Sequence, residues 1–199
     1  MEYTTLSNGV KAPLLGLGTF QLSLADTENA VYEGIRSGVR LIDTANGYLN
    51  ETAVGRAVAR AVDEGLVKRE DLFISTKLWP TVYESESAVD DTLKRLQLDY
   101  VDLLFIHQPA GNFLAGYEKL EKAYREGKAK SLGISNFHDA KLENSWQLQP
   151  SSLMSSSWKP IRTTPIMLRW TASRNTARSS WVGILWATAT PACSVNRSS

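Results

Sequence analysis

One repeating pattern dominates the sequence between residues 14 and 137. Short apolar runs that end in polar residues alternate with stretches whose apolar side chains recur at helical spacing. The predicted strands are residues 14–20, 40–45, 72–79, 101–109 and 131–137. Buried parallel strands have this near-continuous apolar character, and strand–helix alternation is typical of an α/β protein with a parallel sheet.

The segments between the strands are predicted to be amphipathic helices. Asn50 is predicted to cap the helix after the second strand, and a fifth helix is predicted to begin within residues 138–144. Residues 4–15 predict an opening hairpin, in which Asn8 and Gly9 supply the positive φ angles of a tight turn. The apolar helix faces are formed by Ala30, Val31 and Ile35, by Val54, Ala57, Val58, Ala61 and Val62, by Val89, Leu93 and Leu96, and by Phe113, Tyr117, Leu120 and Tyr124.

Chemically capable residues stand at the carboxyl ends of four predicted strands. These residues are Asp43, Lys77, His107 and the pair Ser135 and Asn136, with separations of 34, 30 and 28 residues. If the strands are parallel, all these side chains emerge at one rim of the sheet.

The alternation alone fits both an open doubly wound sheet and a closed (β/α)8 barrel. Barrel enzymes build their sites from several strand ends, whereas an open sheet concentrates its site at one switch point. The dinucleotide fingerprint GxGxxG and a phosphate-binding GKS or GKT loop are both absent. We therefore expect a (β/α)8 TIM barrel.

Each rim residue also has a simpler interpretation when taken alone. Lys77 could be a solvated cap, and His107 an ordinary buried histidine bonded to the backbone. Tyr48 could be a loop aromatic packed on the rim, and Asp43 could bond the next turn. Their joint occurrence at one repeat spacing favours a shared site.

At these positions the sequence resembles the aldo-keto reductase family. DTANGYLNE (43–51) matches the family's Asp-x-Ala-x-x-Tyr-x-Asn-Glu motif. Lys77 in STKLW, His107 in FIHQP and Ser135-Asn136 in GISNF follow in the family's order, and residues 6–20 resemble its hairpin and first strand. The resemblance covers residues 3–144 and implies NADPH-dependent reduction of aldehydes and ketones, as in bacterial reductases of keto-sugars and methylglyoxal.

The resemblance implies a catalytic role for four residues. Tyr48 would donate a proton to the carbonyl oxygen that receives negative charge during hydride transfer. An unperturbed phenol has a pKa of about 10, and Lys77, held by Asp43, would lower it. His107 would hydrogen-bond the carbonyl oxygen and orient it.

The resemblance also implies binding residues. Thr19, Asp43, Ser135 and Asn136 would contact the cofactor. The substrate site would be formed by His107 together with Trp79 and Phe20, and no metal is expected.

The composition changes near residue 144. Residues 1–144 contain 16 Lys+Arg and all 21 Asp+Glu, whereas residues 145–199 contain six basic residues, no acidic residue, twelve Ser and five Trp. The family-like pattern ends after the fifth strand, although a full barrel takes about 250 residues. We expect residues 1–144 to form the N-terminal part of a barrel, truncated to a hairpin plus about five βα units. Residues 145–199 are expected to be an aberrant tail, disordered or poorly packed.

A slip of the coding frame by one base near codon 144 is our hypothesis for this tail. If each codon starts one base earlier, the Trp158/Lys159 junction must encode Glu. The Trp181/Val182 and Trp186/Ala187 junctions must then encode Gly. The slip accounts for the missing acids, the excess of Ser and Trp, and the lost periodicity.

The composition limits the classes of partner and the cellular compartment that we expect for this protein. One cysteine, a net charge of +1, no long apolar run and a polar beginning predict a cytoplasmic protein without nucleic-acid or membrane partners. We expect a monomer that acts on a small-molecule carbonyl substrate. Two alternatives remain open: an inactive truncated fragment with unpaired sheet edges, and a regulatory subunit that binds nicotinamide without turnover.

Overall fold

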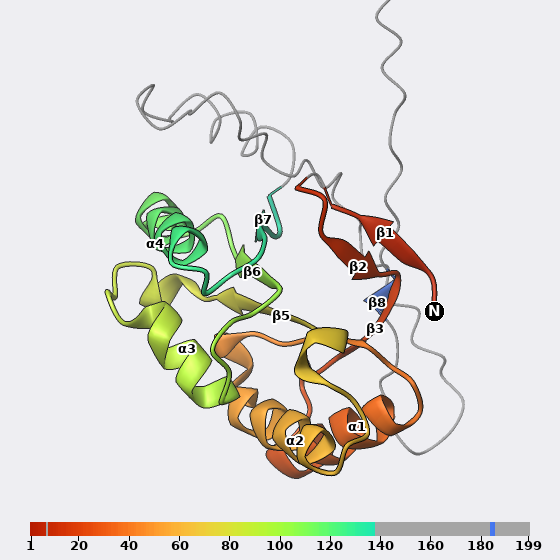
Figure 1. The fold of residues 1–199 in the computed structure, drawn as a ribbon. Helices are drawn as coiled ribbons and strands as arrows, with labels where there is room; N and C mark the ends of the chain where they lie inside the picture. The colour runs from red at the N-terminus through yellow and green to blue at the C-terminus, as the bar shows by residue number, and fades with distance from the viewer. Residues whose placement is uncertain (7, 138–183, 186–199) are drawn as a thin grey trace, which may run out of the picture.

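Five parallel strands, arranged in the order in which they occur along the chain, form the centre of the molecule (Figure 1). The computed structural model describes residues 1–6, 8–137 and 184–185. The strands are β3 (Leu15–Gly18), β4 (Leu41–Asp43), β5 (Phe73–Leu78), β6 (Leu103–Ile106) and β7 (Leu132–Ile134). Each pairs in parallel with the next, from β3 through to β7.

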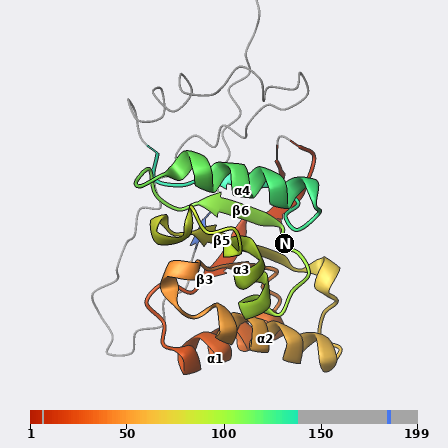
Figure 2. The ribbon, with the colours of Figure 1, turned by 90° about the vertical axis from the view of Figure 1, so that its left-hand side faces the viewer.

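Four helices cover one face of this sheet. They are α1 (Leu24–Arg36), α2 (Glu51–Asp63), α3 (Ala88–Leu96) and α4 (Phe113–Arg125). Figures 1 and 2 show them following one another along the outer side of the strands. An open doubly wound sheet has helices on both faces and a reversal in strand order. The sequential order with helices on one face therefore confirms the barrel-type winding expected from the sequence.

The predicted apolar helix faces form the core between the helices and the sheet. Val31, Ile35, Val54, Val58 and Leu120 are among the residues that pack with the outward side chains of the strands. Those strand residues are Leu17, Ile42, Ile74, Leu104 and Ile106. The helical spacing in the sequence thus identified the buried faces.

A β-hairpin covers the opposite face of the sheet at its amino end. It consists of β1 (Tyr3–Thr5) and β2 (Lys11–Pro13), which pair in antiparallel fashion. Leu6 and Ala12 of the hairpin form a second buried cluster with the inward side chains of three strands, Leu41, Phe73, Leu103 and Phe105. In Figure 1 the hairpin lies across the sheet from the helices.

The hairpin ends in the predicted tight turn, since the Gly9 N–H donates to the Leu6 carbonyl at 2.9 Å and the Leu6 N–H to the Val10 carbonyl at 2.8 Å. Only Gly9 has a positive φ, of 88°, among the described residues of the loop, and the strands are separated by residues 6–10. The Asn8 side-chain oxygen accepts from the Val10 N–H at 3.3 Å, and its amide nitrogen also donates to the Lys130 carbonyl at 2.9 Å and to the Ser131 hydroxyl at 3.1 Å. Asn8 therefore both supports the turn and ties it to the segment that leads into β7.

The described residues also include three short 3₁₀ helices and one further strand. The 3₁₀ helices are η1 (Asn46–Tyr48), η2 (Arg69–Asp71) and η3 (Pro80–Val82). Strand β8 (Ile184–Leu185) pairs in antiparallel fashion with β3. The predicted fifth helix and the rest of the predicted tail lie outside the described residues. No helix of the described part of the chain is long and apolar enough to cross a membrane.

Candidate active site

The structure places the predicted strand-end residues at a single rim of the sheet. Asp43 ends β4 and is in register with Gly18 of β3 and with Ser75 of β5. Lys77 lies near the end of β5, and His107 follows β6 directly, with its backbone N–H bonded to the Leu78 carbonyl. Parallel pairing in register is what aligns these carboxyl ends.

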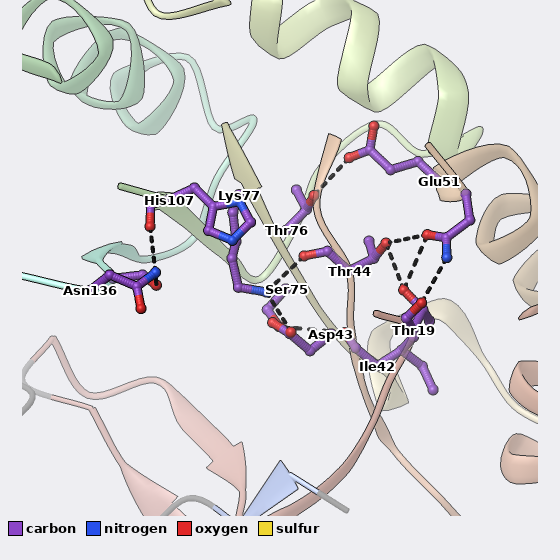
Figure 3. A network of polar contacts seen from close by, with 12 residues as sticks. Thr19, Ile42, Asp43, Thr44, Glu51, Ser75, Thr76, Lys77, His107 and Asn136 are labelled. Atoms are coloured by element: carbon purple, nitrogen blue, oxygen red, sulfur yellow. Dashed lines mark hydrogen bonds and ion pairs between the residues drawn. The ribbon is translucent and has the colours of Figure 1, made fainter. Parts of the chain in front are cut away.

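Lys77 is held from two sides beneath the rim (Figure 3). Its Nζ donates to Asp43 Oδ2 and, at 2.9 Å, to the Thr44 carbonyl. The other Asp43 oxygen accepts a hydrogen bond of 2.7 Å from the Ser75 hydroxyl. Lys77 is only 9% exposed, so it is not a solvated cap, and Asp43 bonds a neighbouring strand rather than the next turn.

Tyr48 ends the short helix η1 beside this ion pair. Asn46 of the same turn accepts a 2.7 Å hydrogen bond from the Trp79 backbone N–H, which fastens the turn to the end of β5. The Tyr48 ring centroid lies 5.2 Å from Lys77 Nζ and 4.9 Å from the Phe20 ring centroid. The phenol and the ammonium are therefore neighbours.

The net pKa shift of Tyr48 is opposite to the expected one. Burial raises the pKa of the phenol above 10, and the Asp43 charge adds to this effect. Lys77 lowers the pKa through its charge and a hydrogen bond, as expected from the sequence, but burial outweighs it. Tyr48 is thus held as the neutral phenol, the form that has a proton to donate.

His107 lies against both aromatic neighbours at the rim. Its ring is edge-on to Trp79 at 4.7 Å and to Tyr48 at 5.5 Å between centroids. Burial, with the Lys77 charge, lowers the pKa of His107 to about 4, so the imidazole is neutral at physiological pH. Its buried Nδ1 has no hydrogen-bond partner among the described residues, so the side chain is not bonded to backbone there.

Ser135 and Asn136 follow β7 at the same rim. Asn136 has a positive φ of 64°, a conformation that asparagine tolerates better than most residues. Its Nδ2 donates to the His107 carbonyl at 2.8 Å and to the Ser135 hydroxyl at 3.0 Å. These bonds fix the two residues to each other and to the end of β6.

Phe20 and Trp79 are the exposed aromatic side chains at the rim. Phe20 is 52% exposed and Trp79 is 37% exposed, although each packs on one of the polar aromatic residues described above. The Trp79 indole also lies so close to Gly47 that a Cβ there would be 3.2 Å from it. Apolar surface of this kind is available for contact with an organic ligand.

Thr19 lies deeper than the other predicted cofactor residues. It is fully buried, and its hydroxyl donates to Thr44 Oγ1 at 2.9 Å and lies 3.2 Å from Asn50 Oδ1. The predicted position of Asn50 at the start of α2 is confirmed, because it is the N-cap residue, but its side chain makes no capping hydrogen bond. Its carbonyl accepts the first helical hydrogen bonds, whereas its side-chain amide bonds the Thr19 carbonyl and the Thr44 hydroxyl at the neighbouring strand ends.

Sequence reasoning did not assign a function to Thr44, Asn50 and Glu51. Glu51 is buried and accepts hydrogen bonds of 2.7 Å from Thr76 Oγ1 and from Arg95 Nε. Burial raises the pKa of its carboxyl above the ordinary value. Asn50 and Glu51 both belong to the motif at residues 43–51, so this motif could have identified them as site residues from the sequence.

No group of three or more potential metal ligands occurs within the described residues.

Comparisons with known proteins place this site in a family. The model of the aldo/keto reductase family matches residues 14–162. An NAD(P)H-dependent D-xylose reductase of Kluyveromyces lactis is 39% identical over 177 residues, covering 72% of this chain and 54% of that protein. The uncharacterized oxidoreductase YtbE of Bacillus subtilis is 41% identical over 145 residues, covering 70% and 52%.

A solved structure has the same fold. The crystal structure of a Bombyx mori aldo-keto reductase in complex with NADP matches with a TM-score of 0.70 and 31% identity, over 80% of this chain and 56% of that one. The chain thus spans about half the length of the relatives it matches. The matched residues and the shared fold show that the chain belongs to the aldo/keto reductase family.

Proposed function

We propose that this site reduces aldehydes and ketones to alcohols, with hydride from NADPH and a proton from Tyr48. The observation that carries the proposal is the meeting of Tyr48, His107 and the Lys77–Asp43 ion pair at one rim. A phenol and a neutral imidazole next to a buried ammonium can donate hydrogen bonds to a carbonyl oxygen that becomes negative.

The rim residues fit the carboxamide end of a nicotinamide. Asn136 Oδ1 accepts no hydrogen bond from the described residues, and the Ser135 hydroxyl accepts one and still has its proton to donate. Together they offer an acceptor for an amide N–H and a donor for an amide oxygen. Asp43 lies at the same rim, and Thr19 would act from beneath it through its contacts with Thr44. When bound, the reduced nicotinamide supplies the hydride.

Each residue of the site has a defined task in this proposal. The Tyr48 Oη holds the proton and releases it to the substrate oxygen. The Lys77 ammonium stabilises the phenolate that remains, because an opposite charge nearby favours the ionised form. Neutral His107 hydrogen-bonds the substrate oxygen, and Phe20 and Trp79 contact the rest of the substrate.

The relatives support the choice of cofactor, and the composition supports the class of substrate. The D-xylose reductase of K. lactis is named as NAD(P)H-dependent, and the B. mori structure contains NADP, so NADPH is the cofactor we propose. Low net charge supports a small-molecule substrate rather than nucleic acid. We further propose a monomer in the cytoplasm.

Two measurements on the full chain test the proposal. NADPH fluorescence titration reports cofactor binding, and the loss of NADPH absorbance with methylglyoxal reports turnover. Binding and turnover are the expected result. Binding without turnover would instead favour the regulatory-subunit alternative, and the absence of both would favour the inactive fragment.

A further inference from the structure

A buried polar network lies directly behind the Lys77 ammonium. Thr44 is fully buried and has hydrogen bonds on two sides. Its carbonyl accepts from Lys77 Nζ at 2.9 Å, whereas its hydroxyl donates to Asn50 Oδ1 at 3.1 Å. Figure 3 shows Thr44 between Lys77 and Thr19. Thr44 therefore connects the Asn50 amide to the Lys77 ammonium.

The Asn50 amide uses both its donors and its acceptor in this network. Its Nδ2 lies 2.7 Å from the Thr19 carbonyl, 3.1 Å from Thr27 Oγ1 and 3.3 Å from the Leu22 carbonyl. Asn50 is only 2% exposed, so water does not replace a lost partner. Aspartate has the same size but no donor, and it would place a negative charge against two carbonyl oxygens.

Asn50 is also joined to Tyr48 through the backbone. It lies two residues after Tyr48, and its carbonyl accepts from the N–H groups of Ala53 and Val54 at the start of α2. The same residue therefore fixes the end of the turn that carries the phenol and, through Thr44, one side of the Lys77 site.

We propose that Asn50 is a positioning residue that sets the Lys77 ammonium against the Tyr48 phenol by way of Thr44. The inference rests on the proposed function, because the distance between these two groups matters only if Tyr48 donates the proton. Asn50 itself touches no reacting atom.

The network contains a second buried threonine, Thr27, that can serve as a control for a purely structural role of Asn50. Thr27 is fully buried in α1, and its Oγ1 accepts from the same Asn50 amide at 3.1 Å. Thr44→Val and Thr27→Val each remove one buried hydroxyl that bonds Asn50. Only Thr44 also bonds Lys77, through its backbone carbonyl, which valine keeps. If Asn50 has a purely structural role, the two variants should have similar effects on kcat. If Asn50 positions Lys77, only Thr44→Val should lower kcat.

The test compares Asn50→Asp, Thr44→Val and Thr27→Val in the full chain. We expect Asn50→Asp and Thr44→Val to lower kcat by roughly tenfold to a hundredfold, since small misplacements of reacting groups have effects of this order. KM for methylglyoxal should stay within about twofold, because the residues proposed to contact the substrate are not altered. Thr27→Val should lower the melting temperature as Thr44→Val does, with kcat unchanged.

An NMR measurement on Tyr48 tests the positioning role of Asn50 even if the chain shows no turnover. The ¹³Cζ resonance of Tyr48, assigned by its loss in Tyr48→Phe, reports the surroundings of the phenol oxygen at pH 8. It should move in Asn50→Asp and Thr44→Val and stay in place in Thr27→Val. Equal effects of the two threonine variants on kcat and on this resonance would overturn the proposal.

The experiments distinguish failure of the proposed carbonyl reduction from failure of the positioning role of Asn50. If the unaltered chain reduces no carbonyl, the proposed activity fails and the Tyr48 resonance alone decides the positioning role. If Asn50→Asp does not fold, the two valine variants decide it, because both are nearly isosteric with threonine.

Discussion

At the scale of single residues, Tyr48 carries the most direct prediction. Its burial and the adjacent Lys77 ammonium suit it to donate a proton. Tyr48→Phe should lower kcat by about 10² to 10⁴, the usual contribution of a general acid, with NADPH affinity nearly unchanged. Steady-state kinetics and fluorescence titration measure the two quantities. Tyr3→Phe, at an exposed tyrosine of β1, is the control and should change neither. Undiminished turnover in Tyr48→Phe removes this residue from the mechanism.

His107 predicts a pH dependence of stability. Its pKa is about 4 in the folded chain and about 6.5 when unfolded, so the unfolded state binds more protons between these values. The stability linked to neutral His107 is fully present above pH 6.5 and is lost as the pH falls to about 4. The loss is on the order of 3 kcal/mol at pH 4.

Urea unfolding at pH 7 and at pH 4 measures this loss. The variant His107→Gln lacks the titrating group, so its stability should fall less than that of the unaltered chain over the same interval. An equal fall in both proteins would show that His107 does not carry the effect.

At the scale of elements, the close contact between α2 and α3 depends on one glycine. A Cβ at Gly55 would lie 2.5 Å from the Leu96 carbonyl oxygen, which is backbone and cannot turn aside. Gly55→Ala should therefore destabilise the chain by about 1–3 kcal/mol, as other overpacked sites do.

Gly34 in α1 is the matched control for this prediction. A Cβ there would lie 3.7 Å from Val39, an ordinary contact, so Gly34→Ala should stabilise the chain by about 0.5–1 kcal/mol through helix propensity. Thermal and urea unfolding of both variants provide the comparison. Two variants of equal stability would mean that α2 and α3 can separate freely.

At the scale of the whole molecule, the hairpin β1–β2 covers the inner face of the sheet. Removal of residues 1–13 uncovers the cluster that contains Leu41, Phe73 and Phe105. We expect lower stability and increased binding of the dye ANS, which reports exposed apolar surface.

Asn8→Ala is the control for this deletion. It keeps the apolar residues of the hairpin and removes the side-chain hydrogen bonds to Lys130, Ser131 and Val10, at a cost of about 1–3 kcal/mol. Its ANS fluorescence should stay low. High fluorescence with Asn8→Ala as well would show that the tip contact, rather than apolar cover, holds the inner face closed.

The composition of the chain changes at residue 144. We propose that residues 1–144 are the N-terminal part of the reductase barrel and that the tail results from a shifted frame. The coding DNA tests it: one base earlier, the frame should encode family-like sequence with the forced Glu and Gly residues. A frame without that sequence refutes the slip.

The sequence alone determined the repeat of strands and helices and the order of the rim residues. Apolar periodicity follows from which side chains are buried, and the spacing of Asp43, Lys77, His107 and Ser135 follows from the length of one βα unit. Both are local properties of the chain, so both could be predicted before the structure was known.

Only the tertiary structure decided how these residues are used. Asn50 was predicted to cap a helix and does stand at its N-cap, but its side chain bonds Thr19, Thr44 and Thr27 rather than the first turn. Asn8 was predicted to shape a turn and does bond Val10 there, but its amide also bonds residues more than 120 positions away. The pKa of Tyr48 rises because burial outweighs the Lys77 charge. Hydrogen-bond partners and desolvation depend on groups distant in the sequence, and local patterns do not contain them.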